Sequence, residues 1–129
     1  MSVLELNGRV FDASTTGTLT LTGEGSATTD VTQGLAKSWI NLNGTGTVAI
    51  RDSQNVASLT DNETGDYSST FSNNMTTTNY ATFVSDGGRG DCTIATSATS
   101  SQAIHHYATD GNSSSDEDLL TQSIFGDLA

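Results

Sequence analysis

The sequence has few of the cysteines that cross-link many folds and few of the basic residues that bind nucleic acid. It contains no proline, one cysteine, and 4 lysine and arginine residues against 15 aspartate and glutamate residues, for a net charge of −11. A single cysteine excludes an intrachain disulfide. A chain this acidic repels phosphate groups, so we expect no nucleic-acid partner.

Long apolar runs are also missing. No stretch approaches the roughly 18 consecutive apolar residues that indicate a transmembrane helix. The first ten residues lack the basic region and apolar stretch of a secretory signal. We therefore expect a protein made in a reducing cytoplasm that has no membrane partner.

Large apolar side chains are scarce as well. Leu, Ile, Val and Phe together make up 25 of the 129 residues, a proportion close to that of disordered chains. The regular spacing of these residues is what argues for a fold. A core this small gives one chain little stabilisation against the entropy lost on folding. Burial of surface between copies would supply more, so we expect an oligomer.

Threonine, serine and glycine are what the chain has in abundance, at 22, 17 and 13 residues. Threonine favours strands, whereas serine and glycine favour turns. After Ala36, short alternating stretches recur about every 8–12 residues, which is typical of sandwiches and barrels. We predict an all-β body, an antiparallel β-sandwich with a jelly-roll-like arrangement. The predicted strands are 37–42, 47–51, 55–60, 67–71, 79–84, 92–96, 103–108 and 121–126.

The N-terminal region differs from this body. Alternation and an Asn7-Gly8 turn predict a hairpin over 3–11, followed by a strand over 18–22. Residues 24–33 are polar and predict a connector, so we divide the chain into an extended N-terminal β arm with its connector, 1–34, and a body, 35–129. A lone hairpin is only marginally stable in water, so we expect the arm to lie on another surface and to attach the protein there. The side chains expected to make this contact are Val3, Leu4, Leu6, Val10 and Phe11.

Several segments at fixed spacing carry a family resemblance. They are Ala36-Lys37-Ser38-Trp39, Asn43-Gly44-Thr45-Gly46, Ile50-Arg51-Asp52-Ser53, Thr60-Asp61-Asn62 with Gly65-Asp66-Tyr67, Asn79-Tyr80-Ala81, and Ile124-Phe125-Gly126-Asp127. This succession, from Leu35 to the C-terminus, resembles a module of small structural and fibre-like proteins of tailed bacteriophages, those of cyanophages and other aquatic phages above all. The module often has proline before its Asn-Tyr-Ala segment, where this chain has Thr76-Thr77-Thr78. The resemblance implies a virion structural β-domain that is often trimeric.

Residues that could carry chemistry do not form a recognisable site. His105 and His106 are adjacent on a predicted strand, so their side chains point to opposite faces and cannot bind one ion together. With Cys92 they are too few for a zinc site. No Gly-x-Ser-x-Gly elbow is present, and 8 aromatic residues are few to line a sugar cleft. We expect no catalytic residue, no cofactor and no metal.

Two short motifs and one aromatic residue leave alternatives open. The acidic turns at 61–66 and 116–118 offer oxygen ligands for calcium, although solvated turns explain them more simply. Arg89-Gly90-Asp91 matches a cell-attachment tripeptide, but a match of this length is weak. Trp39, with Ile40 and Leu42, predicts a core or inter-subunit anchor; the alternative for Trp39 is stacking on a host glycan.

The resemblance, taken together with these observations, implies a non-enzymatic protein located in a bacteriophage virion. We expect a homotrimeric decoration, or cement, protein on the outside of the head, whose partners are its own copies and the major capsid protein. The alternative is the receptor-binding tip of a short tail fibre, with loops 86–91 and 110–118 touching glycans on the host surface.

Overall fold

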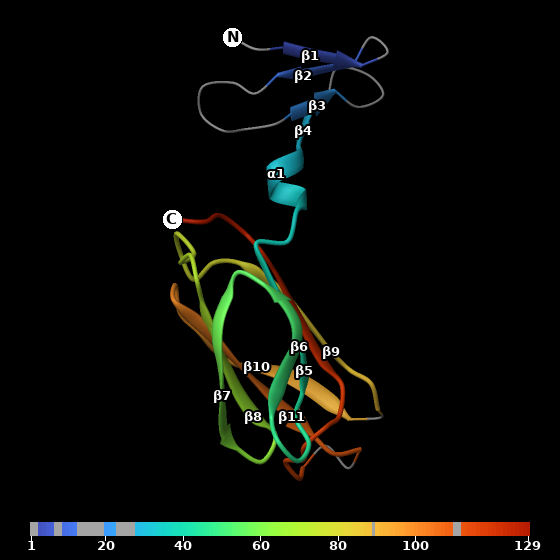
Figure 1. Cartoon of the computed structure of the whole chain (residues 1–129), viewed down its shortest axis with the longest axis vertical. Coiled ribbons are helices and arrows are strands. Elements are labelled where there is room, and N and C mark those ends of the chain that lie inside the picture. The colour runs from blue at the N-terminus through green and yellow to red at the C-terminus, as the bar shows by residue number, and fades with distance from the viewer. Residues whose placement is uncertain (1–2, 7–8, 13–19, 23–27, 89, 110–111) are drawn as a thin grey trace. The chain divides into compact units, whose positions relative to one another are not determined.

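The computed structural model describes residues 3–6, 9–12, 20–22, 28–88, 90–109 and 112–129, with side chains from Asp30 onward. The chain divides into two compact units, Met1–Leu35 and Ala36–Ala129 (Figure 1). The second unit is the body, and it contains nearly all of the described side chains.

The described residues of the N-terminal unit form two short antiparallel pairs and one helical turn. Strand β1 (Val3–Leu6) pairs with β2 (Arg9–Asp12), and β3 (Thr20–Thr22) pairs with β4 (Thr28–Asp30). The four-residue helix α1 (Val31–Gly34) follows, capped by the Asp30 carboxylate, which accepts a hydrogen bond from Thr32 N at 2.8 Å.

Two predictions for this region need comment. The described part of the predicted connector, from Thr28 onward, contains β4, which is rich in β-branched threonine, and the start of α1, which Asp30 caps. The Asn7-Gly8 turn lies outside the described residues. So do the side chains expected to attach the arm, namely Val3, Leu4, Leu6, Val10 and Phe11.

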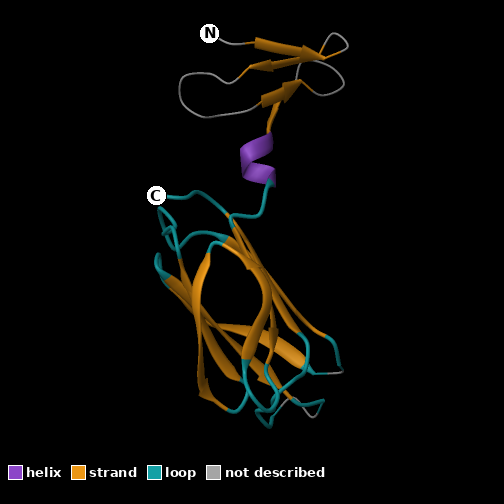
Figure 2. Cartoon of the chain, in the orientation of Figure 1, coloured by secondary structure: helices purple, strands orange, loops and turns teal. Residues whose placement is uncertain are grey.

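The body is a sandwich of two four-stranded antiparallel sheets, which confirms the predicted all-β fold (Figure 2). One sheet has the order β6 (Ala49–Gln54), β5 (Ser38–Asn43), β12 (Leu120–Phe125) and β9 (Ala81–Asp86). The other has the order β10 (Asp91–Ser97), β11 (Ser101–Tyr107), β8 (Asp66–Phe71) and β7 (Val56–Glu63). No helix occurs among the described residues of the body.

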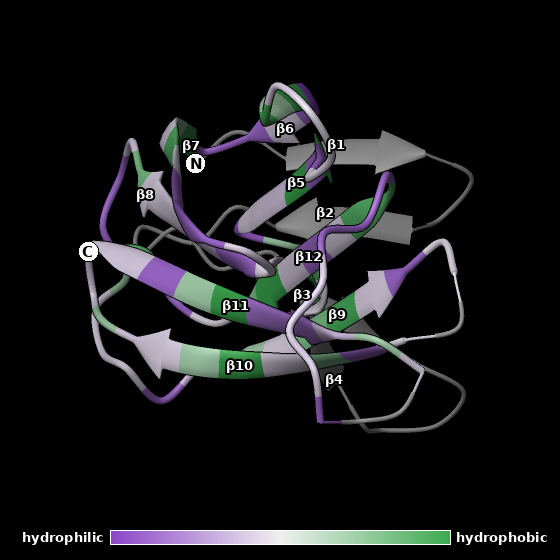
Figure 3. Cartoon of the chain, turned by 90° about the horizontal axis from the view of Figure 1, so that it is seen from below, coloured by the Kyte–Doolittle hydropathy of each residue, from purple (hydrophilic) through white to green (hydrophobic). Residues whose placement is uncertain are grey.

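The core follows from strict alternation along three strands, β5, β8 and β12, in which every second residue is buried. Figure 3 shows the resulting bands of contrasting hydropathy along the strands. Buried apolar side chains form two clusters between the sheets. One contains Ile40, Leu42, Tyr67, Ile104 and Leu120, and the other contains Phe71, Met75 and Ile124.

A layer of buried polar side chains lies among these apolar residues and links the two sheets. Gln122 on β12 donates to Gln102 Oε1 on β11 at 2.7 Å and accepts from Ser69 Oγ on β8 at 3.1 Å. Thr82 Oγ1 on β9 also donates to Gln102 Oε1, at 3.1 Å. These hydrogen bonds satisfy polar groups that would otherwise be costly to bury.

At two places, the connection between consecutive strands is shorter than the sequence predicts. The expected loop at 61–66 is a hairpin turn, because β7 continues to Glu63 and Gly65 adopts a φ of 73°. Asn55 alone separates β6 from β7 and carries the chain from one sheet to the other with a φ of 55°. Its side chain accepts from Asn73 N at 2.7 Å and donates to Asn73 O at 3.0 Å.

Candidate binding face

The pairing registers place the outward-facing side chains of the β6-β5-β12-β9 sheet in rows. Trp39 on β5 lies opposite Ser123 on β12, and Ser123 lies opposite Phe83 on β9. Gln54 on β6 extends this row beyond Trp39. We call this surface the aromatic face and define it by nine outward-facing residues: Trp39, Asn41, Asp52, Gln54, Phe83, Ser85, Thr121, Ser123 and Phe125.

Three of the chain's 8 aromatic residues lie on this face. Phe83 is 67% exposed and is the most exposed large apolar side chain among the described residues. The Phe125 ring stands edge-on to it, with centroids 5.8 Å apart and planes at 87°. Trp39 is half-buried, and its indole N–H donates to Gln54 Oε1 at 2.9 Å. Each exposed ring is therefore held by a neighbour.

The adjoining row on the aromatic face is polar. Asn41 lies between Asp52 and Thr121, and Thr121 lies opposite Ser85. Asn41 Oδ1 is a buried atom that has no hydrogen-bond partner among the described residues. A buried acceptor without a donor costs about 1–3 kcal/mol, and such atoms are often satisfied by a water or a ligand.

The outer face of the other sheet has a different character. Its strands present mainly small hydroxyl side chains, such as Ser58 and Thr70, whose oxygens are 2.6 Å apart. Its one aromatic pair is His105 and Tyr107, which stack on each other with centroids 4.6 Å apart. Large exposed aromatic side chains are thus concentrated on one of the two outer faces.

The structure places the two adjacent histidines on opposite sides of β11, as predicted. His106 is buried, at 2% exposed, and its Nε2 is 3.1 Å from Asp86 Oδ2. Its Nδ1 is 2.8 Å from Ser115 O and 3.2 Å from Ser115 Oγ. These are the residue types of a Ser-His-Asp triad, but a side chain at Gly90 would already collide with the ring. The buried imidazole links β11 to Asp86 at the end of β9 and to Ser115 in the loop that follows β11.

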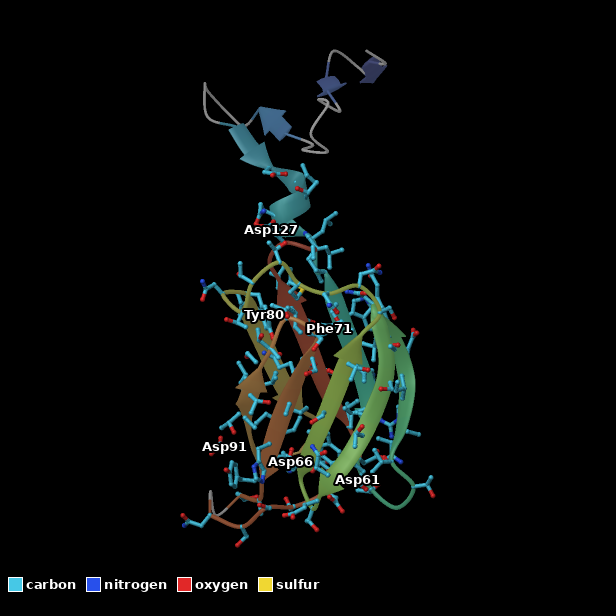
Figure 4. The ribbon with its side chains drawn as sticks, turned by 90° about the vertical axis from the view of Figure 1, so that its left-hand side faces the viewer. Asp61, Asp66, Phe71, Tyr80, Asp91 and Asp127 are labelled. Carbon is cyan, nitrogen blue, oxygen red and sulfur yellow. The ribbon has the colours of Figure 1, made fainter. Side chains whose placement is uncertain are left out.

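Acidic side chains gather at one end of the body. Asp61, Asp66 and Asp91 lie there, whereas Phe71 and Tyr80 lie towards the end that carries Asp127 (Figure 4). No group of three or more His, Cys, Asp or Glu side chains in the described part of the chain is arranged to hold a metal ion.

Two titratable groups near this end have raised pKa values. Burial, followed by the hydrogen bond from its hydroxyl to Asp116 and the charge of that carboxylate, raises the pKa of Tyr67. Burial also raises the pKa of the Cys92 thiol to about 11, and the negative charges of Asp86, Glu117 and Asp91 add to the shift. Both groups are therefore held in their neutral forms at neutral pH.

The three residues predicted as a core or inter-subunit anchor separate into two groups. Ile40 and Leu42 are each 1% exposed and face the opposite sheet, whereas Trp39 points outward. The sequence did not identify Phe83 or Phe125 as partners of Trp39. The signal that could have done so is the alternation 82–84, which puts Phe83 on the face opposite to Val84.

Arg89 of the tripeptide motif lies outside the described residues. No described helix is long and apolar enough to cross a membrane. Comparison of the chain with protein-family models, with curated proteins and with solved structures found no match.

Proposed function

We propose that the chain is a non-enzymatic structural protein of a bacteriophage virion, a homotrimer that decorates the outside of the head and contacts the major capsid protein. The phage-like segments from Leu35 onward support this proposal. The observation that carries it is the division into a small β unit, Met1–Leu35, and a sandwich, Ala36–Ala129. Such a division suits a protein that attaches with one part and displays the other.

Strands β1 and β2 give the attachment a physical route. A two-stranded hairpin has backbone groups left over on its outer edges. An edge of this kind can add to a strand of a neighbouring subunit, with main-chain hydrogen bonds supplying affinity. The attachment surface would therefore be the arm that carries Val3, Leu4, Leu6, Val10 and Phe11.

Deletion of residues 2–21 tests this proposal. The shortened protein should stay soluble and oligomeric, but it should no longer co-sediment with phage capsids from which the protein has been stripped. Full-length protein added to the same capsids is the control. If the shortened protein reaches full-length occupancy, attachment lies in the sandwich and the proposed role of the arm is wrong.

A second candidate function is the receptor-binding tip of a short tail fibre. The 67% exposure of Phe83, which contacts Phe125 and shares a row with Trp39, favours it, because large exposed apolar patches often mark binding sites. Copy number separates the two candidates. A decoration protein should be present in virions at a copy number close to that of the major capsid protein, and a fibre tip at a small fraction of it, by quantitative gel electrophoresis.

A further inference from the structure

We propose that the aromatic face binds an uncharged, extended glycan, a β-1,4-linked hexose chain that lies across strands β5, β12 and β9. The inference deepens the second candidate function, since it names the site and the ligand class. It rests on the geometry of this sheet, and it holds for a head protein as well as for a fibre tip.

The spacing of the aromatic rings is the first argument. Trp39, Ser123 and Phe83 form one row across three adjacent strands. Neighbouring strands are about 4.8 Å apart, so the two aromatic positions are roughly 10 Å apart. This separation is comparable to the disaccharide repeat of an extended β-1,4-linked chain. The two aromatic residues would therefore contact alternate sugar rings, and the sugar between them would lie over the small Ser123.

The chemistry of stacking is the second argument. The face of an aromatic ring is electron-rich, and the C–H groups on one face of a hexose ring carry the complementary partial charge. The hydrogen bond of Trp39 Nε1–H to Gln54 fixes the indole, and the edge-on contact with Phe125 supports Phe83. Rings held in this way before binding lose little entropy when a ligand arrives.

The polar row supplies the third argument, because a sugar must also find hydrogen-bond partners for its hydroxyl groups. Next to the aromatic row lie the carboxylate of Asp52, the amide of Asn41 and the hydroxyl groups of Thr121 and Ser85. Asn41 Oδ1 lacks a donor among the described residues. A small rotation of this amide towards the ligand would give its oxygen a hydroxyl donor.

Charge favours a neutral ligand. Asp52 is the one charged side chain among the nine residues of the aromatic face, and the whole chain carries −11. Acidic polysaccharides would be repelled by this charge. The aromatic row itself offers no cationic side chain that would pair with a carboxylate or sulfate group.

A second copy of the chain fits the face less well. Three aromatic side chains bury about 150–250 Å² each when fully covered, whereas an obligate interface buries about 1,000 Å² or more on each partner. The six remaining residues of the face are polar or charged. The face therefore has the size and polarity of a glycan platform.

Isothermal titration calorimetry on the full-length protein tests the inference. The probes are cellohexaose, mannohexaose and chitohexaose, with maltohexaose and polygalacturonate as comparisons. At least one of the three β-1,4-linked hexamers should bind saturably, and α-linked maltohexaose and anionic polygalacturonate should bind at least about tenfold more weakly. If none of the three hexamers binds saturably, the inference is wrong.

Matched variants locate the site. Phe83→Ser should weaken binding about tenfold, which corresponds to about 1.4 kcal/mol, whereas Phe83→Tyr should retain the affinity within about twofold because it keeps the stacking ring. Tyr107→Ser removes a ring from the opposite sheet and should leave binding unchanged. Phe83 is 67% exposed, so its replacement should spare the fold, and circular dichroism checks this.

Two other results would contradict the assignment. If Phe83→Ser and the wild-type protein bind with equal affinity, the glycan binds elsewhere. If Phe83→Ser dissociates into monomers, the aromatic face is an interface with a second copy of the chain. Capsid co-sedimentation of Phe83→Ser keeps this test separate from the decoration proposal. That variant should still bind capsids while it loses the glycan.

Discussion

At the scale of single residues, the hydrogen-bonded layer of Ser69, Gln102 and Gln122 distinguishes this core from an apolar one. The layer compensates in part for the low content of large apolar side chains, because it joins the sheets through directed bonds. The stability of the layer depends on each of its members, because a buried polar group that loses its hydrogen-bond partner destabilises the folded state.

Gln122→Ala should lower the free energy of unfolding by about 2–3 kcal/mol, because it opens a cavity and removes a donor from Gln102 and an acceptor from Ser69. Urea denaturation measures the change. Thr60→Val, on the exposed side of β7, is the control and should change stability by less than about 0.5 kcal/mol. Equal effects of the two substitutions would show that the layer contributes little.

Cys92 should react slowly with a thiol reagent. Its pKa is raised from 9.0 to about 11, so the thiolate fraction at pH 8 should be about 100-fold lower than in the unfolded chain. Stopped-flow measurement with Ellman's reagent in buffer and in urea gives the ratio of rates. Because the unfolded thiol releases its proton first, the contribution of Cys92 to stability should be lost as the pH rises from 9 towards 11. A native rate equal to the unfolded rate would contradict both expectations.

Sequence reasoning at this scale could place residues on faces but could not pair them. The opposite orientation of His105 and His106 follows from strand geometry alone. The contact of His106 with Asp86 and Ser115 depends on where three separate segments meet. For the same reason, the neighbours of Trp39 on the aromatic face came only with the strand order.

At the scale of elements, the corner at Asn55 is the most demanding connection in the body. Asn55 is the one non-glycine residue with a positive φ in the described part of the chain. It also holds Asn73 through hydrogen bonds in both directions. Asparagine tolerates this backbone conformation better than most residues do.

Substitution at Asn55 separates backbone strain from side-chain bonding. Asn55→Gly should cost about 1 kcal/mol, because it keeps the backbone conformation and loses the bonds to Asn73. Asn55→Ala should be about 1 kcal/mol less stable than the glycine variant, because a β-carbon is disfavoured at positive φ. The measurement is the free energy of unfolding in urea. An alanine variant as stable as the glycine variant would show that strain is not a factor.

Alternation in the sequence located every strand of the body, but the ends of several strands differ. Segment 61–66 contains turn-forming residues, yet cross-strand pairing extends β7 through it to Glu63. The polar composition of residues 28–34 did not indicate β4 or α1, which are held by backbone pairing and an Asp cap. Local composition does not record such pairing, because the partner strand lies elsewhere in the chain.

At the scale of the whole molecule, the proposed assembly into a homotrimer sets the mass of the particle in solution. If the protein is the proposed homotrimer, light scattering on dilute full-length protein should give about 40 kDa, three times 13.4 kDa. A stable, folded species of 13.4 kDa would contradict the trimer. The same measurement on the variant without residues 2–21 shows whether the arm contributes to assembly.

The fold class could be inferred from the sequence, because threonine-rich alternation with frequent turns is compatible with few folds other than an all-β sandwich or barrel. The order of the strands could not, and the aromatic face depends on that order. Trp39 and Phe83 are far apart in the chain, and they share a row only because β12, the last strand of the body, lies between β5 and β9.

The corner of the sandwich at Asn55 also affects how the protein behaves when it is crowded. The edge strand β6 of one sheet continues directly into the edge strand β7 of the other through Asn55. The β6–β7 edge is therefore bent at Asn55, which makes it a poorer template for a strand of another molecule than a long, straight edge. Together with mutual repulsion between acidic chains, this geometry should discourage amyloid-like association, even where many copies accumulate in a small volume.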